Sequence, residues 1–240
     1  MALSLARQNE YRERYRQIRS GWRTSGEVYE AMVRRCVGSN ASRVRALDLG
    51  CGAGGVMELL SEGVQLSVGV DPDLVSLYGH RNEAICLTAG RAEQLPFAEE
   101  EFDLVTCSWV FEHLYDPARA FAEIARVLKT GGHLVFLTPN AQSLVVKLNR
   151  LAPRMMQHWL VGLLYGRGER DTFPTTYAVN SVGRVDALAR AVGLRQVQVQ
   201  LVSDPTYLAF NDLFFQISLL CESLISEDRF VHIVGDYAKE

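Results

Sequence analysis

Hydrophobic and polar positions along the chain follow a pattern that changes near residue 44. Residues 1–38 carry helical spacing, with a break expected at Ser20 and Gly21. Between residues 44 and 138, short apolar runs alternate with stretches of helical spacing. This alternation is typical of βαβ units, and it predicts a parallel sheet with helices on both faces.

Punctuating residues set the bounds of the elements expected in this central region. Asp116 and Pro117 are suited to begin a helix, as N-cap and first-turn residue. Gly131 and Gly132 are expected to end it, because glycine favours the conformation that closes helices. The expected strands are 44–49, 64–70, 84–88, 102–107 and 133–137, with further helices at 56–60 and 74–80.

The last hundred residues carry a different pattern. Residues 140–179 form a long connection that mixes aromatic, apolar and basic residues, and connections of this length are usually functional or disordered. Asn180 is placed to cap a helix that runs to about residue 192. Strands are expected at 197–202 and 229–237, with a strongly apolar helix at 207–225 between them.

Composition and charge narrow the class of protein. With 240 residues, 48% of them hydrophobic, the chain is expected to form a single α/β domain. The net charge of −3 gives no reason to expect a nucleic-acid partner, and the arginines within 1–38 are interpreted as a solvated helix face. No apolar run is long enough to span a membrane, and the N-terminus lacks the apolar core of a secretion signal.

Cysteine and histidine positions show no metal-binding spacing. The chain has five of each, with no C-x-x-C pair and no histidine pair at helical spacing, so we expect no metal site. The odd cysteine count predicts a reducing, cytoplasmic compartment. Cys86 and Cys107 lie in strand-like runs, where buried thiols are common.

The strongest local signal is the segment Leu47–Gly55, in which an apolar run leads into a glycine-rich turn. Glycines after a strand let the backbone turn sharply and approach a ligand, and the following helix offers free N–H groups. Asp71 ends the next predicted strand, where a carboxylate can accept hydrogen bonds from both hydroxyls of a ribose. Because Gly50, Gly52 and Gly55 also satisfy G-x-G-x-x-G, a dinucleotide-dependent oxidoreductase remains an alternative.

Five segments in order resemble the motifs of class I S-adenosylmethionine (SAM)-dependent methyltransferases. They are Leu47–Gly55, Gly69–Asp73, Arg91–Phe97, Phe102–Leu114 and Val127–Asn140. The resemblance is to small-molecule enzymes of the ubiquinone and menaquinone biosynthesis type and to related tailoring enzymes of secondary metabolism. It implies a Rossmann-like, seven-stranded, mostly parallel sheet with an antiparallel last strand, with a helical cap at 1–40, a SAM-binding core at 41–140 and acceptor-lid insertions at 140–179 and 205–226.

The same resemblance implies SAM as the cofactor and indicates which residues contact it. These residues are Asp48, Gly50, Cys51, Gly52, Asp71, Ala92, Glu93, Ser108 and Trp109. Asp48 is expected to order the turn from behind rather than to touch the ligand. Arg91 stands where the family often has an aspartate, so the adenine amino group must find its acceptor at Glu93 or at a backbone carbonyl.

Methyl transfer from a sulfonium is an in-line displacement, so the protein mainly positions the donor and the acceptor. A hydroxyl acceptor gains from a general base, and His113 is the best-placed titratable group, with local pocket shaping as its alternative role. His158 and Tyr177 are expected at the acceptor site, with packing as the alternative role of each. The chain has Cys107–Val110 where nucleic-acid methyltransferases of this fold carry an Asn/Asp-Pro-Pro-aromatic run, which leaves that function as a weaker alternative.

The apolar helix expected at 207–225 has three interpretations. It can cap an apolar acceptor pocket, pair with a second copy in a homodimer, or lie on a membrane surface without spanning it.

Overall fold

A computed structural model describes residues 5–60, 62–151 and 174–240. The chain separates into two compact units. The sheet unit consists of Gly26–Pro139, Thr175–Gln200 and Ile233–Glu240, and the helical unit consists of Met1–Ser25, Asn140–Pro174 and Leu201–His232. No helix in the described part of the chain is long and apolar enough to cross a membrane.

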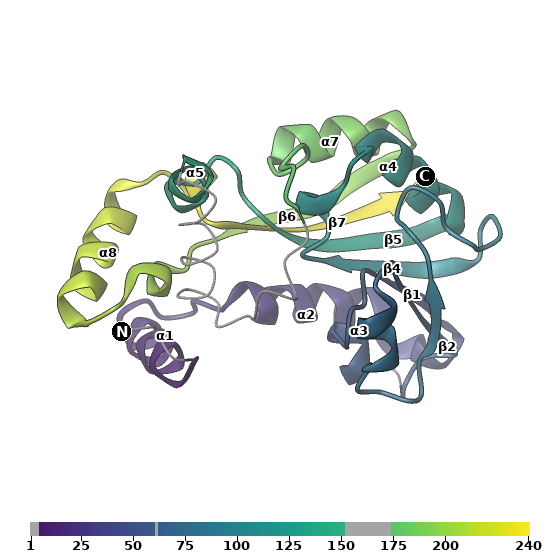
Figure 1. Cartoon of the computed structure of the whole chain (residues 1–240), viewed down its shortest axis with the longest axis horizontal. Coiled ribbons are helices and arrows are strands. Elements are labelled where there is room, and N and C mark those ends of the chain that lie inside the picture. Colours follow the sequence, from purple (N-terminus) through teal and green to yellow (C-terminus); the bar gives the residue numbers. More distant parts are fainter. Residues whose placement is uncertain (1–4, 61, 152–173) are drawn as a thin grey trace. The chain divides into compact units, whose positions relative to one another are not determined.

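Seven strands form one sheet in the order β3-β2-β1-β4-β5-β7-β6. The strands are β1 Arg45–Leu49, β2 Leu66–Asp71, β3 Cys86–Ala89, β4 Phe102–Ser108, β5 Leu128–Pro139, β6 Leu194–Val202 and β7 His232–Lys239. The central strand β1 pairs in parallel with β2 and β4, and β3 and β5 extend the parallel part on either side. Figure 1 shows β7 running opposite to β5. The expected seven-stranded, mostly parallel Rossmann-like fold with an antiparallel last strand is therefore confirmed.

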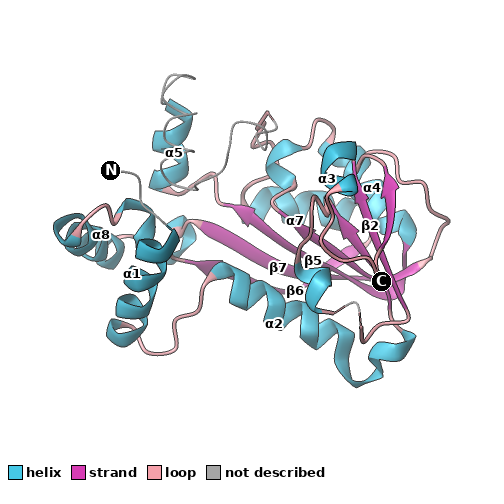
Figure 2. Cartoon of the chain, turned by 60° about the horizontal axis from the view of Figure 1, so that its bottom comes forward, coloured by secondary structure: helices cyan, strands magenta, loops and turns pink. Residues whose placement is uncertain are grey.

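Helices cover both faces of this sheet, with α4 and α7 on one face and α2 across the other (Figures 1 and 2). The α-helices are α1 Leu5–Ile18, α2 Ser25–Val37, α3 Leu74–Tyr78, α4 Pro117–Val127, α5 Leu144–Leu151, α7 Val182–Ala191 and α8 Asp212–Leu224. Short 3-10 helices lie at Gly38–Arg43, Val56–Leu59, Phe111–His113, Pro205–Leu208 and Glu227–Arg229. Helix α4 begins as expected, because the Asp116 side chain accepts a hydrogen bond from the Arg119 N–H and Pro117 fills the first turn.

The expectation that Gly131 and Gly132 end helix α4 is wrong. The helix ends at Val127, and the following residue, Leu128, already pairs with Phe102 of β4. The register between β4 and β5 shifts just after this pair. A Cβ atom at Gly132 would lie 3.1 Å from the Asp103 carbonyl oxygen, so this glycine lets β5 run close to β4.

The expected cap at Asn180 is also wrong. Ser181 is the N-cap residue of α7, and the Asn180 side chain is buried and donates to the Thr138 hydroxyl. The helix expected at 207–225 begins later, because Asn211 caps α8 by accepting the Phe214 N–H. Cys86 is exposed rather than buried, since β3 is an edge strand.

The arginines of α1, and Arg19 just after it, are exposed or partly exposed, as a solvated helix face requires, and they also make contacts within the helical unit. Within the helical unit these arginines form ion pairs, Arg12 with Asp204, Arg14 with Asp212 and Arg19 with Glu222. On the same helix, Tyr11 and Tyr15 are buried in a cluster with Ala209 and Phe215. The positive charge of α1 is therefore largely balanced by the carboxylates of Asp204 and α8.

Candidate cofactor site

The turn after β1 is held against the end of β2 by backbone hydrogen bonds. Gly50 and Cys51 both donate their N–H groups to the Val70 carbonyl, at 2.8 and 3.2 Å. Gly50 has a φ of 73°, and a Cβ atom there would lie 2.3 Å from the Val110 side chain, so only glycine fits. At Gly52, with φ of 52°, a Cβ atom would meet no atom within 4 Å. The turn is thus closely packed behind Gly50 and open in front of Gly52.

Asp71 fixes this turn through its carboxylate. One oxygen accepts the Gly52 N–H at 2.9 Å, and the other accepts the Asp73 N–H at 2.8 Å. The side chain is buried, with only 7% of the residue exposed. A carboxylate has about four lone-pair sites, so about two remain for the hydroxyl groups of a ligand.

Asp48 lies on β1, behind the turn. It accepts a hydrogen bond from the Thr106 hydroxyl at 2.8 Å, and a Cβ atom on Gly55 would lie 3.2 Å from its other oxygen. Burial, together with the nearby charges of Asp71 and Glu58, raises the pKa of Asp48 to about 7, against the lowering effect of the Thr106 hydrogen bond. The protonation of this carboxyl therefore changes near neutral pH.

Cys51 contributes its backbone rather than its thiol to the turn. Its side chain is buried, and a Cβ atom on Gly69 would lie 2.8 Å from the sulfur, so the thiol packs on β2. Burial raises the pKa of Cys51 to about 12, which keeps the thiol protonated. The predicted cofactor contact of Cys51 is thereby limited to main-chain atoms.

The loop after β3 holds the predicted adenine-side residues. The Glu93 carboxylate accepts the Tyr115 N–H at 3.1 Å and lies 3.7 Å from the Arg91 guanidinium. That guanidinium also stacks over the Tyr115 ring, 5.3 Å from its centroid. Ala92 is buried. Glu93 is thus oriented by two partners from this chain.

The end of β4 carries an unusual backbone conformation. Trp109 has a φ of 59°, in the left-handed region that non-glycine residues rarely adopt, and its N–H donates to the Leu137 carbonyl at 2.9 Å. Ser108, which precedes it, is the last residue of β4. Because Val110 contacts Gly50, this bend lies next to the glycine turn. Strain of this kind clusters at functional sites.

Hydrogen bonds place the segment carrying Tyr177 beside the residues around His113. The Thr176 and Tyr177 N–H groups both donate to the Glu112 carbonyl, at 2.7 and 3.3 Å. The Thr176 hydroxyl donates to the Leu114 carbonyl at 2.9 Å. Two of the residues predicted for the acceptor chemistry thus lie on neighbouring backbone segments.

A chain of hydrogen bonds between three buried polar residues was not predicted from the sequence. Asn180 donates to the Thr138 hydroxyl at 2.6 Å, and that hydroxyl donates to the Glu112 carboxylate at 3.2 Å. All three residues are at most 5% exposed. No local pattern reveals such partners, which lie 42 and 26 positions apart. His158, the other predicted substrate residue, lies outside the described residues.

Comparison with known proteins identifies the central region. Residues 47–136 match the family described as "Methyltransferase domain". These residues are a methyltransferase domain. The resemblance to class I SAM-dependent methyltransferases is confirmed for this region.

Sequence relatives agree with the domain match. The chain is 34% identical over 120 residues to the uncharacterized methyltransferase YcgJ of Bacillus subtilis, covering 45% of this chain and 47% of that protein. It is 36% identical over 115 residues to a ubiquinone biosynthesis O-methyltransferase of Alkalilimnicola ehrlichii, covering 45% and 46%. It is 39% identical over 98 residues to a demethylmenaquinone methyltransferase of Corynebacterium kroppenstedtii, covering 40% and 43%. The chain thus spans about half the length of the curated relatives it matches.

The solved structure of YcgJ has the same fold as this methyltransferase domain and its flanking elements. The superposition has a TM-score of 0.59 at 19% sequence identity, and it covers 89% of this chain and 99% of YcgJ. The likeness therefore extends beyond residues 47–136 to most of the chain, although at this identity it concerns the fold alone.

Substitution of Gly50 by alanine tests the close packing of the turn. We expect Gly50→Ala to lower the free energy of unfolding by about 2–4 kcal/mol, because steric overlap with Val110 adds to backbone strain. Gly131→Ala is the matched control, since Gly131 has a similar φ of 80° and open space around it. It should cost only about 1–2 kcal/mol, the backbone strain alone. Urea unfolding measures both, and equal losses would contradict the overlap.

Proposed function

We propose that this methyltransferase domain transfers the methyl group of SAM to a small, partly apolar metabolite. The observation that carries the proposal is the glycine turn held by Asp71, with open space in front of Gly52. A buried carboxylate with lone pairs to spare, next to backbone approachable at a glycine, suits a ribose and its neighbouring groups.

The chain's residues fit this cofactor in a consistent way. Asp71 would accept hydrogen bonds from the ribose hydroxyls, and Gly50 and Gly52 would let the backbone approach the ligand. Ala92 and Glu93 would flank the adenine, while Ser108 and Trp109 would border the cofactor beside the glycine turn. When bound, SAM supplies a methyl group already activated by its sulfonium charge. The remaining task of the protein is to align an acceptor and exclude water.

The relatives support the proposed acceptor class. A ubiquinone biosynthesis O-methyltransferase and a demethylmenaquinone methyltransferase are among the similar proteins, which supports a small acceptor with an apolar part. Neither a dinucleotide-dependent oxidoreductase nor a nucleic-acid methyltransferase gains support from them. We propose that His113 removes the acceptor proton and that His158 and Tyr177 contact the acceptor.

Binding of S-adenosylhomocysteine, the product form of the cofactor, tests the site by calorimetric titration. The wild-type protein should bind it, and Asp71→Asn should weaken binding at least tenfold, because an amide nitrogen then faces a backbone N–H or a ligand hydroxyl. Asp103→Asn is the matched control, because Asp103 lies at the start of β4, away from Ser108 and the glycine turn. This variant should bind S-adenosylhomocysteine as tightly as the wild type. Binding of NADH without binding of S-adenosylhomocysteine would refute the proposal and favour an oxidoreductase.

The role of His113 is tested by turnover with an acceptor selected from a panel of phenols and quinols. We expect His113→Gln to lower kcat by about 10²–10⁴-fold if it transfers a proton, with unchanged affinity for S-adenosylhomocysteine. His80→Gln serves as the control, since His80 bonds locally to the backbone of Asn82. A loss in kcat no larger than that of His80→Gln would assign His113 to pocket shaping.

We propose that a second copy of the chain packs on α8, in the homodimer arrangement. Four exposed residues, Leu213, Ile217, Leu220 and Leu224, follow one another at spacings of four, three and four, which is the seam of two packed helices. The two acidic residues of α8 pair with Arg14 of α1 and with Arg19 just after it, and α8 carries no lysine or arginine. An anionic membrane surface would not attract a helix without basic residues. The apolar face of α8 therefore suits another helix better than a membrane. The cytoplasmic location stays a prediction.

Light scattering on the eluting protein tests this dimer. The wild type should show twice the chain mass of 26.8 kDa, and Leu220→Glu should shift it to the monomer, because the seam would then bury two unpaired carboxylates. Val75→Glu places the same charge on an exposed residue of α3 and should leave the dimer intact. A monomeric wild type that floats with anionic vesicles would instead support membrane contact.

A further inference from the structure

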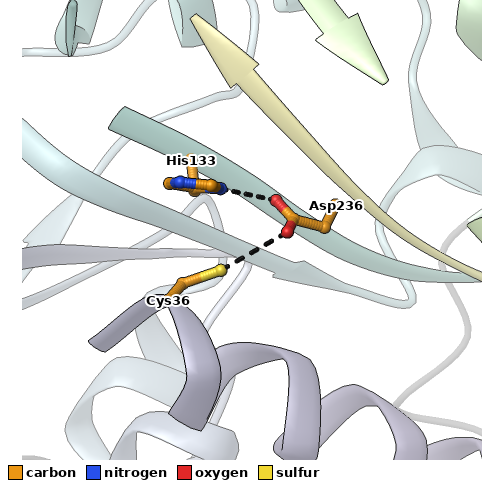
Figure 3. Close-up of side chains that lie close together, drawn as sticks. All are labelled: Cys36, His133 and Asp236. Atoms are coloured by element: carbon orange, nitrogen blue, oxygen red, sulfur yellow. Dashed lines mark hydrogen bonds and ion pairs between the residues drawn. The ribbon is translucent and has the colours of Figure 1, made fainter. Parts of the chain in front are cut away.

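Three side chains with metal-binding atoms converge under α2. Cys36 lies in the last turn of α2, His133 on β5 and Asp236 on β7 (Figure 3). Their ligand atoms all lie within 4.8 Å of one another. The His133 Nδ1 is 2.7 Å from one Asp236 oxygen, and the Cys36 thiol donates to the other oxygen at 3.6 Å. The cluster therefore brings together a sulfur, an imidazole nitrogen and a carboxylate.

This set of donors suits one class of ion. Zinc takes cysteine sulfur, histidine nitrogen and carboxylate oxygen, whereas magnesium and calcium prefer oxygen alone. Tetrahedral bonds of about 2.0–2.3 Å place ligand atoms roughly 3–4 Å apart. The two separations that involve Asp236 are already near this range, and the third needs to close by no more than about 1 Å. We propose that Cys36, His133 and Asp236 bind a zinc ion, with one coordination position left for water.

Binding of the zinc ion releases one proton from the protein. The Cys36 S–H bond breaks, the sulfur bonds to the ion, and the proton leaves to solvent. The His133 proton moves to the nitrogen that does not bind the ion, so that no further proton is lost. Because the His133 side chain is 29% exposed and Cys36 is partly exposed, the ion and its water have a route from solvent. Asp236 needs no proton loss, since His133 and Arg35 lower its pKa against the effect of burial.

Two features oppose the ion. Burial and the Asp236 charge raise the pKa of the Cys36 thiol to about 12, so the metal must displace a tightly held proton. The Arg35 guanidinium lies 2.8 Å from Asp236 and repels a cation. Arg35 also donates to Gln198, and its side chain is half exposed, so it can keep that contact while one Asp236 oxygen turns to the metal. These features predict moderate affinity that Arg35 controls.

Short-range spacing of cysteine and histidine does not reveal this cluster. Asp236 lies 103 positions from His133 and 200 positions from Cys36. The expectation of no metal site rested on short-range cysteine and histidine motifs, which such a site does not form. His133 pairs with Leu104, four residues before β4 ends at Ser108, so the proposed site is separate from the glycine turn.

Cobalt(II) titration tests the site, because thiolate ligation produces a charge-transfer absorption band. The reference protein carries Cys86→Ser and Cys221→Ser, which remove the two exposed thiols. We expect one cobalt per chain with this band, displaced by zinc, and a rise in Tm on adding zinc. Cys36→Ser in the same background should abolish the band, and His133→Gln should weaken binding by about 100-fold. Arg35→Gln should tighten binding by about tenfold, because it removes the opposing charge.

Circular dichroism of each variant without metal separates loss of the site from loss of the fold. A folded reference protein without a charge-transfer band in excess cobalt would overturn the proposal, and so would a band that persists in Cys36→Ser. In either case the cluster would be a hydrogen-bonded link between α2 and the sheet and no more. If His133→Gln and Arg35→Gln bind cobalt as the reference does, the assignment of the ligands is wrong.

Discussion

The candidate site depends on one carboxylate that accepts backbone N–H groups from two turns. Asp71 ends β2, and its oxygens hold Gly52 on one side and Asp73 on the other. Besides this link, the Val70 carbonyl holds the backbone of the glycine turn to β2, and a glycine-rich turn has much conformational entropy to lose. The acid predicted to bind a ribose is therefore also the group that shapes the backbone facing it.

A chain of hydrogen bonds between buried polar residues organises the segments around His113. Glu112, Thr138 and Asn180 are hydrogen-bonded in sequence, and the Glu112 carbonyl also receives the N–H groups of Thr176 and Tyr177. Buried polar networks fix geometry because each unpaired member costs free energy. Both the side chain and the main chain of Glu112 thus set the relative positions of the segments that carry His113 and Tyr177.

Local patterns in the sequence predicted the sheet well. Features that depend on partners distant in the sequence were not predicted. The Asp116 cap needs only its own helix, so the sequence identifies it. The conformations at Gly132 and Asn180 depend on partners in β4 and β5, and their predicted roles in helix ends were wrong. The glycine turn and Asp71 lie where the sequence placed them, because both follow strands with clear apolar patterns. The Glu112 chain and the Cys36 cluster join residues far apart in sequence, which periodicity does not relate.

Helix α2 lies over two buried acids of the sheet unit whose pKa values are shifted, Asp48 and Asp236. Tyr29 and Cys36 are seven residues apart, two helical turns, so they share one face of α2. Asp48 raises the pKa of the buried Tyr29 hydroxyl, in addition to burial itself, which places the two groups close together. Cys36 meets Asp236 at the other end of the same face. An ion that fixed Cys36 to the sheet would restrict the motion of α2 and so of Tyr29. The environment of Asp48, whose pKa is about 7, would then depend on contacts about 10 Å further along the same helix.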